Sequence, residues 1–247
     1  MKLLVVFGSL SDSATYEPLL RGLETLGECQ FEIISAHRDP NKLHRCLESS
    51  SYDAVVAGAG LAAHLPGVIA SQTDKAVLGV PVRANFGGLD SLMSIQQMPF
   101  GVPVISAAPE HPEDIVVFVA LWQDARRKGV TGKRINLMTP REWIERPQFS
   151  KEVIRAKEYA AQEKIELHMI DSFHTDGNPC IVLTNSGTHV YKDIFCIHVP
   201  VLDDYEKGDP NHAVEFFNLV NTGGVWVGVN NSRNAIIAIQ RLFACPP

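Results

Sequence analysis

Two histidines and an arginine follow short apolar runs that have the length of buried β-strands. His37 and Arg38 come directly after the run at residues 31–35, and His64 lies in the loop after the run at residues 54–57. An imidazole donates and accepts protons near neutral pH, and a guanidinium offers an anion a charged fork of N–H donors. Single histidines are more often structural and single arginines more often solvated, but the shared strand-end position favours acid–base chemistry beside an anion.

The segment after the first apolar run, at residues 8–12, reads Gly-Ser-Leu-Ser-Asp. A glycine turn with hydroxyls at a helix N-terminus offers backbone amides to a phosphate, and Asp12 can accept hydrogen bonds from ribose hydroxyls. An ordinary helix cap explains the same residues equally well, because Ser and Asp are preferred there. The nearby Arg38 favours a mononucleotide site over the cap.

A glycine-rich loop follows the third apolar run, with glycines at positions 58, 60 and 67. Such a loop can pass close to a ligand and present amides to a carboxylate or to carbon dioxide, although tight packing of a helix on a sheet is the alternative. The chain has no dinucleotide fingerprint, P-loop lysine, G-x-S-x-G elbow or zinc-spaced histidine pair. We therefore expect a reaction that needs no cofactor.

These loops must be positioned by the strands and helices around them. Continuous apolar runs predict strands buried on both faces of a parallel sheet, and leucines at helical spacing predict the helices between them. The pattern indicates an α/β protein with a three-layer, doubly wound, flavodoxin-like sheet, whose strand-end loops meet in one crevice. The expected strands are residues 3–7, 31–35, 54–57, 76–82 and 102–107, and the expected helices run from 11 or 12 to 26, from 40 to about 51 and from 111 to 122.

Two of these helices carry recognisable end signals. Gly27 predicts a left-handed stop after the first helix, and Asp39 followed by Pro40 predicts the start of the second. Both signals predict that only short loops connect these helices to the neighbouring strands.

The pattern of the first half starts again after Arg126. Any two α/β units look somewhat alike, but the matching segments occur in the same order, which favours a tandem duplication. We expect one domain at residues 1–128 and a second, degenerate copy at residues 129–247. The matching pairs are 3–6 with 135–138, 35–37 with 172–174, 59–60 with 186–187, 80–82 with 199–201 and 101–104 with 224–227.

Composition excludes several classes of protein. With 22 Lys and Arg against 28 Asp and Glu, the net charge of −6 offers no basic surplus for nucleic acid. Five cysteines without a C-x-x-C pair are typical of a reducing compartment, and no apolar run has the length of a signal core or a membrane span. We expect a cytoplasmic protein without nucleic-acid or membrane partners.

Four ordered motifs resemble one known family. GSLSD, SAHRDP, GAGLAAHLPG and GLDSLMSIQQMP, between residues 8 and 99, are similar to the PurE family of 5-(carboxyamino)imidazole ribonucleotide mutases and aminoimidazole ribonucleotide carboxylases. The resemblance spans about residues 1–126 and implies the transfer of a carboxylate from the exocyclic nitrogen to ring carbon 4 of an imidazole ribonucleotide. The implied partners are this nucleotide and carbon dioxide, and neither a metal nor an organic cofactor is implied.

The resemblance also implies a role for each site residue. His37 carries the proton, His64 shapes the pocket, and the loop from Gly58 to His64 holds carbon dioxide. The substrate-binding residues it implies are Ser9, Ser11, Asp12, Ser35, Arg38, Gly58, Ala59, Gly60, Ala63 and Leu65.

The sequence departs from the family at several positions. Leu61 replaces a usual glycine and would narrow the carbon dioxide pocket, Ser13 replaces a common tryptophan, and residues 84–87 fit poorly. In the second half, Thr139 to Trp143 replaces GSLSD and Thr175 replaces Arg38, although His174 remains, so we expect no catalysis there.

The form of the SAHR and AAHLPG motifs favours the mutase over the carboxylase that uses free carbon dioxide. A non-catalytic nucleotide-binding module is the remaining alternative, with Leu61 as its reason. Since members of the family form octamers, four fused chains would replace eight subunits, which implies a homotetramer.

Overall fold

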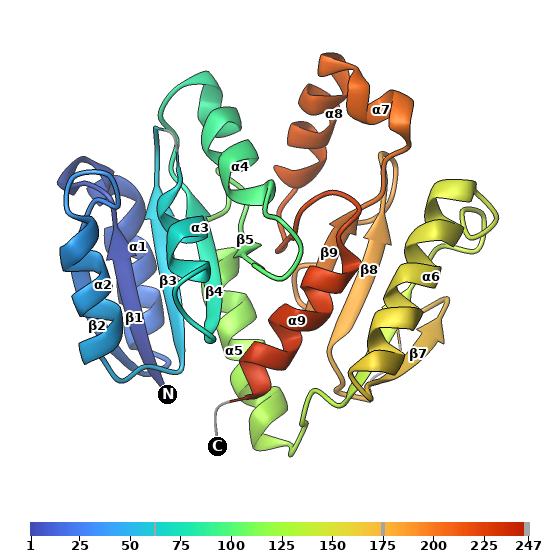
Figure 1. The fold of residues 1–247 in the computed structure, drawn as a ribbon, viewed down its shortest axis with the longest axis horizontal. Coiled ribbons are helices and arrows are strands. Elements are labelled where there is room, and N and C mark those ends of the chain that lie inside the picture. The colour runs from blue at the N-terminus through green and yellow to red at the C-terminus, as the bar shows by residue number, and fades with distance from the viewer. Residues whose placement is uncertain (62, 174–175, 245–247) are drawn as a thin grey trace.

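The computed structural model of this chain describes residues 1–61, 63–173 and 176–244, and it contains two all-parallel sheets that lie side by side (Figure 1). The strand orders, β2-β1-β3-β4-β5 and β7-β6-β8-β9, follow the same winding, which confirms the doubly wound, flavodoxin-like class. The first sheet comprises β1 (Lys2–Phe7), β2 (Glu28–Ile33), β3 (Ala54–Ala59), β4 (Ala76–Pro81) and β5 (Ile105–Ser106). The second comprises β6 (Arg134–Met138), β7 (Glu166–Ile170), β8 (Cys180–Thr184) and β9 (Cys196–Pro200).

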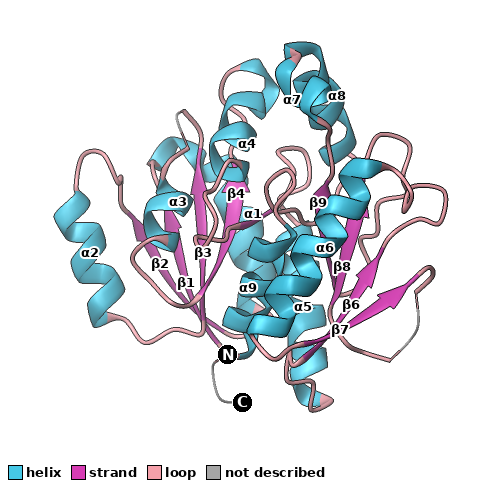
Figure 2. Cartoon of the chain, turned by 45° about the vertical axis from the view of Figure 1, so that its right-hand side comes forward, coloured by secondary structure: helices cyan, strands magenta, loops and turns pink. Residues whose placement is uncertain are grey.

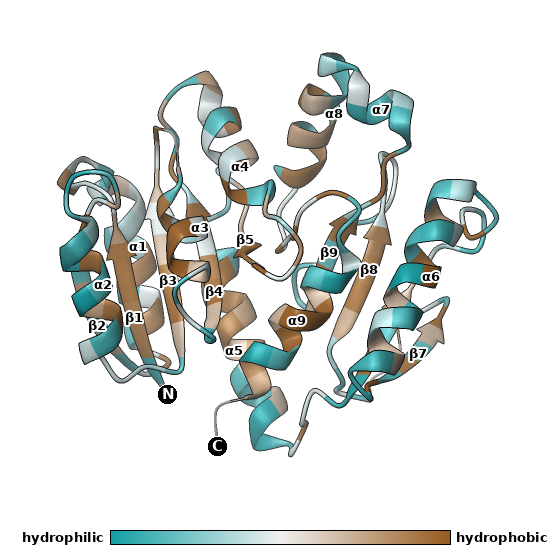
Figure 3. Ribbon diagram, in the orientation of Figure 1, coloured by the Kyte–Doolittle hydropathy of each residue, from teal (hydrophilic) through white to brown (hydrophobic). Residues whose placement is uncertain are grey.

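Helices cover both faces of the first sheet because its central strands are apolar on both sides. In β1, Leu3 and Val5 pack with α1 (Ser13–Glu24) and α5 (Asp114–Arg127), whereas Leu4 packs with α2 (Pro40–Ser49) and α3 (Leu65–Ala70). Successive side chains of a strand point to opposite faces, so one apolar run supports two helical layers. The apolar interior strands are visible as brown arrows in Figure 3.

The second half has fewer helices among its described residues. α6 (Pro147–Gln162) follows β6, α7 (Asp204–Gly208) and α8 (Pro210–Val220) follow β9, and α9 (Ser232–Phe243) ends the described chain. Helix α9 packs against α6 and also contacts β4 of the first sheet, so the two halves share a helix layer (Figure 2). α4 (Leu89–Gln96) and two 3-10 turns, Leu10–Asp12 and Phe86–Gly88, complete the described elements.

One residue, Trp226, joins the two sheets. Its backbone N–H and C=O exchange two 2.8 Å hydrogen bonds with Ser106 of β5, and it also bridges to His198 of β9. Ser106 in turn pairs with Gly79 of β4. The correspondence is therefore 79 with 198 and 106 with 226, at offsets of 119 and 120. This differs from the sequence alignment of 101–104 with 224–227, because the strand register, rather than the shared glycine, defines the equivalent positions.

Several expected boundaries differ in the structure. Gly27 does not adopt a left-handed conformation, and it is instead required because a Cβ there would collide with the carbonyl group of Met1. The last strand of the first sheet is limited to β5, since residues 102–104 make no ladder, and α5 runs past the expected end at residue 122 to Arg127. The apolar face of α5 stays buried as far as Ala125, which explains why this helix is longer than expected.

His198 is a structural histidine at this junction, and it predicts a loss of stability in acid. It is fully buried, its Nδ1 donates to the Val225 carbonyl at 3.0 Å, and its Nε2 accepts from the Tyr191 N–H at 3.1 Å. Burial lowers the pKa of His198 from 6.5 to about 4. The unfolded chain therefore binds a proton that the folded chain rejects, and stability falls as the pH drops from 6.5 toward 4, by at most about 3 kcal/mol.

Urea unfolding at intervals between pH 7.5 and 4 measures this loss. We expect H198Q to be less stable at neutral pH but to lose less stability in acid than the unchanged protein. H44Q, at an exposed histidine on α2, is the matched control and should keep the original slope. An H198Q profile parallel to that of the unchanged protein would show that His198 is not the group that titrates.

Candidate functional site

A cavity of about 580 Å³ lies at the carboxyl ends of β1, β2, β3 and β4. This is the edge at which ligands bind in open parallel sheets. All its lining residues belong to the first half, so within the described chain the second half adds no side chain to it. They are Gly8, Ser9, Ser11, Asp12, Ser35, Ala36, His37, Arg38, Ala59, Gly60, Leu61, His64, Leu65, Val82, Arg83 and Ala84.

The two histidines form a hydrogen-bonded pair in this cavity. His37 Nε2 lies 3.0 Å from His64 Nδ1, and the rings meet edge to face at 5.2 Å between centroids. One nitrogen donates and the other accepts, so the pair shares one proton between the rings. The other two ring nitrogens, His37 Nδ1 and His64 Nε2, remain for contact with a ligand.

The loop that carries His37 is held by Ser35. The Ser35 hydroxyl accepts from the Arg38 N–H at 3.3 Å, and the Ser35 carbonyl accepts from the Asp39 N–H at 2.9 Å. The resulting turn leads into α2 with Pro40 in its first turn, as expected, although the Asp39 side chain makes no capping hydrogen bond. Ser35 therefore fixes both His37 and Arg38 toward the cavity.

Arg38 lies against the loop that follows β1. Its Nη2 donates to the Gly8 carbonyl at 3.1 Å, and among the described residues it has no carboxylate partner. Ser9 Oγ accepts from the Ser11 N–H at 3.2 Å and from Ser11 Oγ at 2.8 Å, so Ser9 caps the 3-10 turn. The cap and the anion site are therefore compatible, since the cap fixes a hydroxyl-rich loop beside an uncompensated guanidinium.

Asp12 is the only carboxylate among the residues that line the cavity. Partial burial raises the pKa of Asp12 above its ordinary value, and the hydrogen bond from the Ser11 hydroxyl, at 3.3 Å, acts in the opposite direction. Its side chain makes no capping bond to α1. The carboxylate is thus available to a ligand that carries hydroxyl donors.

Two of the expected site residues do not line the cavity. Gly58 lies within β3, where a Cβ would collide with the ring of Phe7, and its carbonyl accepts from the Gly8 N–H at 3.0 Å. Ala63 is fully buried in the core under α2 and α3. Gly58 therefore holds the loop after β1 against β3, and Ala63 contributes to the core.

The glycine at position 60 does line the cavity, and Gly67 has a packing role. A Cβ on Gly60 would lie 3.2 Å from Ala84, so a side chain there would press on the opposite wall. A Cβ on Gly67 would meet the Met98 sulfur at 2.9 Å, which supports the packing explanation for that glycine. Close packing of α3 against the segment after α4 thus accounts for Gly67, rather than packing of a helix on the sheet.

Arg83 was missed among the candidate site residues although a sequence signal was present. It is the second residue after the end of β4, so the strand-end rule that selected His37 also selects it. Leu61, the main departure from the family motif, lines the cavity with 65% of its surface exposed. It therefore lies at the rim rather than filling the cavity.

The corresponding edge of the second sheet has the opposite arrangement of charges. Arg141 follows β6 and Asp171 follows β7, and the two are joined by an ion pair in which Nε lies 2.6 Å from Oδ2. In the first half the carboxylate follows β1 and the arginine follows β2. Arg141 is therefore paired with a carboxylate, whereas Arg38 has no carboxylate partner among the described residues. The prediction that the second half is not catalytic also depended on His174 and Thr175, which lie outside the described residues.

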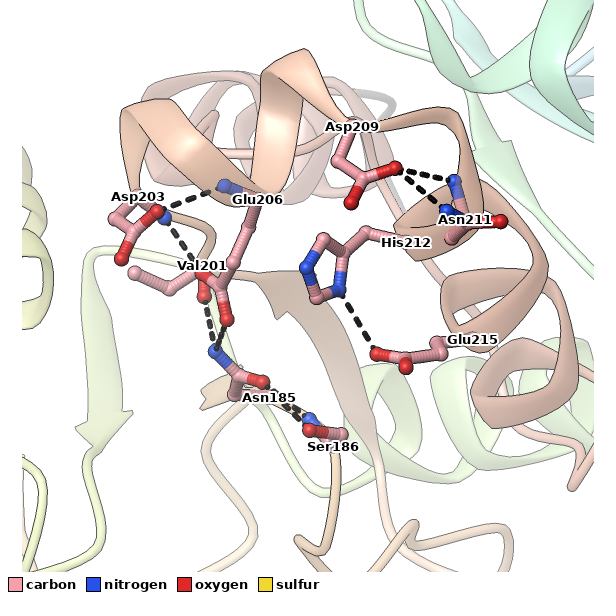
Figure 4. A network of polar contacts seen from close by, with 9 residues as sticks. All are labelled: Asn185, Ser186, Val201, Asp203, Glu206, Asp209, Asn211, His212 and Glu215. Carbon is pink, nitrogen blue, oxygen red and sulfur yellow. Dashed lines mark hydrogen bonds and ion pairs between the residues drawn. The ribbon is translucent and has the colours of Figure 1, made fainter.

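A network of polar contacts joins the loop after β8 to the start of α7, which follows β9 (Figure 4). Asp203 Oδ1 accepts from the Glu206 N–H at 2.8 Å, and Glu206 Oε2 accepts from the Asp203 N–H at 2.7 Å, which forms a capping box for α7. Asn185, just after β8, donates to the Val201 carbonyl at 2.8 Å and to Glu206 at 3.4 Å. These polar groups satisfy one another, as expected of structural rather than ligand-binding residues.

Comparison with known proteins shows relatives that match the first half of the chain and, in one case, extend beyond it. A model described as "AIR carboxylase" matches residues 2–121. The N5-carboxyaminoimidazole ribonucleotide mutase of Methanocaldococcus jannaschii is 34% identical over 163 residues, which cover 66% of this chain and 96% of that protein. The mutase of Escherichia coli (strain K12) is 50% identical over 105 residues, 40% of this chain and 62% of that protein.

A relative with a different printed activity also matches. The chloroplastic phosphoribosylaminoimidazole carboxylase of Vigna aconitifolia is 48% identical over 109 residues, 42% of this chain and 19% of that protein. None of the helices in the described parts of the chain has the length and apolar character of a transmembrane segment. From the near-complete coverage of the archaeal relative and the family match over the strands that build the cavity, the chain belongs to the AIR carboxylase family.

Proposed function

We propose that the chain is a carboxyaminoimidazole ribonucleotide mutase of purine biosynthesis. It would move a carboxylate from the exocyclic nitrogen to ring carbon 4 of the nucleotide. The observation that carries the proposal is the single cavity in which the His37–His64 pair and Arg38 meet, within the segment that matches the family. Relatives named as mutases support this assignment.

The phosphate and ribose would bind at the β1 and β2 side of the cavity. The Arg38 guanidinium would pair with the phosphate, and the hydroxyl groups of Ser9 and Ser11 would donate hydrogen bonds to it. The Asp12 carboxylate would accept hydrogen bonds from the ribose hydroxyls. Ser35 would act by fixing the Arg38 loop, as its two backbone contacts indicate. The imidazole ring would then extend toward the histidine pair.

His37 would carry the proton between two sites on the substrate. Cleavage of the carbamate N–C bond releases carbon dioxide and requires a proton on the exocyclic nitrogen. Attack of carbon 4 on carbon dioxide forms the new C–C bond, and loss of the ring proton from carbon 4 restores aromaticity. One proton is supplied and one is recovered, so one side chain suffices: His37 would start as the imidazolium, with Nε2–H donated to His64 and Nδ1–H toward the substrate, and would regain its Nδ1 proton from carbon 4 in the last step. His64 would stabilise the imidazolium form through the shared hydrogen bond.

An ultraviolet assay of the purified protein tests the proposal. The carbamate nucleotide should be converted without bicarbonate, and aminoimidazole ribonucleotide should require bicarbonate at high concentration. Efficient use of aminoimidazole ribonucleotide with bicarbonate alone would make the chain a carboxylase. Binding of both nucleotides without turnover would make it a non-catalytic module and overturn the proposal.

Leu61 distinguishes the enzyme from the non-catalytic module. Because its side chain is largely exposed at the cavity rim, we expect L61G to change kcat/KM by only about twofold, the effect of a surface contact worth about 0.5 kcal/mol. L10G, at an equally exposed leucine in the neighbouring loop, controls for added backbone freedom. Activity that is absent in the unchanged protein and arises in L61G would instead show that Leu61 blocks the site.

The second half, residues 129–247, would be a degenerate copy that acts as a scaffold in the cytoplasmic enzyme. The matching strand orders of the two sheets and the pairing of Arg141 with Asp171 support this role. Four chains would then form the oligomer, with eight sheets in place of eight subunits. A monomeric mass in light scattering would contradict the tetramer.

A further inference from the structure

The cavity contains a second arginine that no assigned role uses. Arg83 lies beyond the end of β4, whereas Arg38 lies beyond the end of β2, and the sheet order places β1 and β3 between them. Three strand spacings separate β2 from β4, or about 14 Å. The cavity thus receives one arginine from the loop after β2 and one from the segment after β4, and the histidine pair joins the loops after β2 and β3, in a chain whose net charge is −6.

The backbone around Arg83 is anchored on both sides. The Val82 N–H donates to the Ala59 carbonyl at 3.0 Å, and the Val82 carbonyl accepts from Ser91 Oγ at 3.0 Å. Ser91 is fully buried and also donates to the Gly88 carbonyl at 2.9 Å, so it ties the start of α4 to the loop that carries Arg83. Arg83 is therefore presented from a fixed backbone.

A carboxylate orients the Arg83 guanidinium without occupying all of its N–H donors. Arg83 Nη1 lies 2.9 Å from Glu110 Oε2, and their side chains are 58% and 41% exposed. An ion pair with this exposure contributes little to stability and leaves the other N–H donors of the guanidinium free to bind an anion. Glu110 thus holds Arg83 at the cavity edge, and little free energy is needed to move the Arg83 side chain when a ligand binds.

We propose that Arg83 binds the carboxylate of the substrate and product, and so selects carboxylated over non-carboxylated nucleotides. This inference rests on the proposed function. A nucleotide with a phosphate at one end and a carboxylate at the other matches the two cations, with Arg38 facing the phosphate and Arg83 the carboxylate. A guanidinium suits this role because its planar donors match the two oxygens of a carboxylate.

Equilibrium binding of two nucleotides tests the proposal, in an H37N background in which turnover is strongly slowed. The 4-carboxylated aminoimidazole ribonucleotide carries the carboxylate, and aminoimidazole ribonucleotide lacks it. We expect R83Q to weaken binding of the carboxylated nucleotide by about tenfold to a hundredfold, the effect of losing a hydrogen bond to a charged group. Binding of aminoimidazole ribonucleotide should change by less than about twofold, since the exposed Arg83 makes no other predicted contact with it.

Two further variants separate a local contact from a general effect of charge. R127Q removes the same charge from the far end of α5 and should change neither affinity. R83K should retain part of the selectivity, because it keeps the charge but not the planar fork. Equal weakening of both nucleotides in R83Q, or no change in either, would overturn the role of Arg83 while leaving the proposed function intact. Failure of the H37N and unchanged proteins to bind either nucleotide would overturn both.

Discussion

Replacement of His37 by asparagine should lower kcat by about 10² to 10⁴-fold, the usual contribution of a positioned general acid–base group. The asparagine amide takes the place of His37 Nδ1 and can still contact a ligand, but it ends short of the Nε2 position that lies 3.0 Å from His64 Nδ1, and it cannot carry a proton between two sites. Because His37 is an exposed residue in a loop fixed by Ser35, the fold should be unaffected. The ultraviolet assay with the carbamate nucleotide measures the loss.

The matched control for this variant is H44N, on the exposed surface of α2. It makes the same chemical change within the same half of the chain and should keep full activity. Affinity for aminoimidazole ribonucleotide should be close to normal in H37N, which separates a proton-transfer defect from a binding defect. An H37N protein with a tenth or more of the original kcat would exclude His37 as the proton carrier.

Replacement of Trp226 by alanine should lower the free energy of unfolding by about 3 to 5 kcal/mol, as expected for a large aromatic side chain removed from a packed core. Trp226 is fully buried, its Nε1 donates to the Gly223 carbonyl at 2.9 Å, and it packs with Leu92 and Phe216. These neighbours come from both halves of the chain. The backbone bonds to Ser106 do not depend on the side chain, so the loss should come from the cavity that remains.

Urea unfolding monitored by circular dichroism measures this effect. F86A is the control, because it removes an aromatic ring that is 82% exposed and should change stability by no more than about 0.5 kcal/mol. If W226A were as stable as F86A, the two sheets would not be packed together through Trp226. Intermediate destabilisation with two separate transitions would show that the halves unfold independently.

Much of the fold could be predicted from local patterns. The runs that became β1, β3 and β4 are continuously apolar, which is typical of parallel strands covered on both faces, and the structure buries them on both faces. Local patterns specify the residues at the ends of the helices less well. Gly27 has the position of a helix stop, but its reason is the close approach of Met1, a contact between segments far apart in the sequence.

The site could be predicted in outline for the same reason. Parallel strands place their carboxyl ends along one edge, so the loops with Ser9, His37 and His64 had to lie near one another. Gly58 and Ala63 were expected in the cavity but do not line it, because Gly58 lies within β3 against the ring of Phe7 and Ala63 is buried in the core. Which residues of this segment face the cavity depends on where β3 ends and α3 begins. A run of small residues in the sequence does not reveal these two boundaries.

The sequence alone therefore determined the fold class, the strand-end position of the histidines and Arg38, and the family motifs, because these depend on residue order over short distances. The tertiary structure decided which distant residues touch: His37 with His64 and Arg83 with Glu110 through their side chains, and Trp226 with Ser106 through the backbone. These pairs are 27, 27 and 120 residues apart. Such contacts depend on strand register and on the packing of distant segments, which local periodicity does not specify.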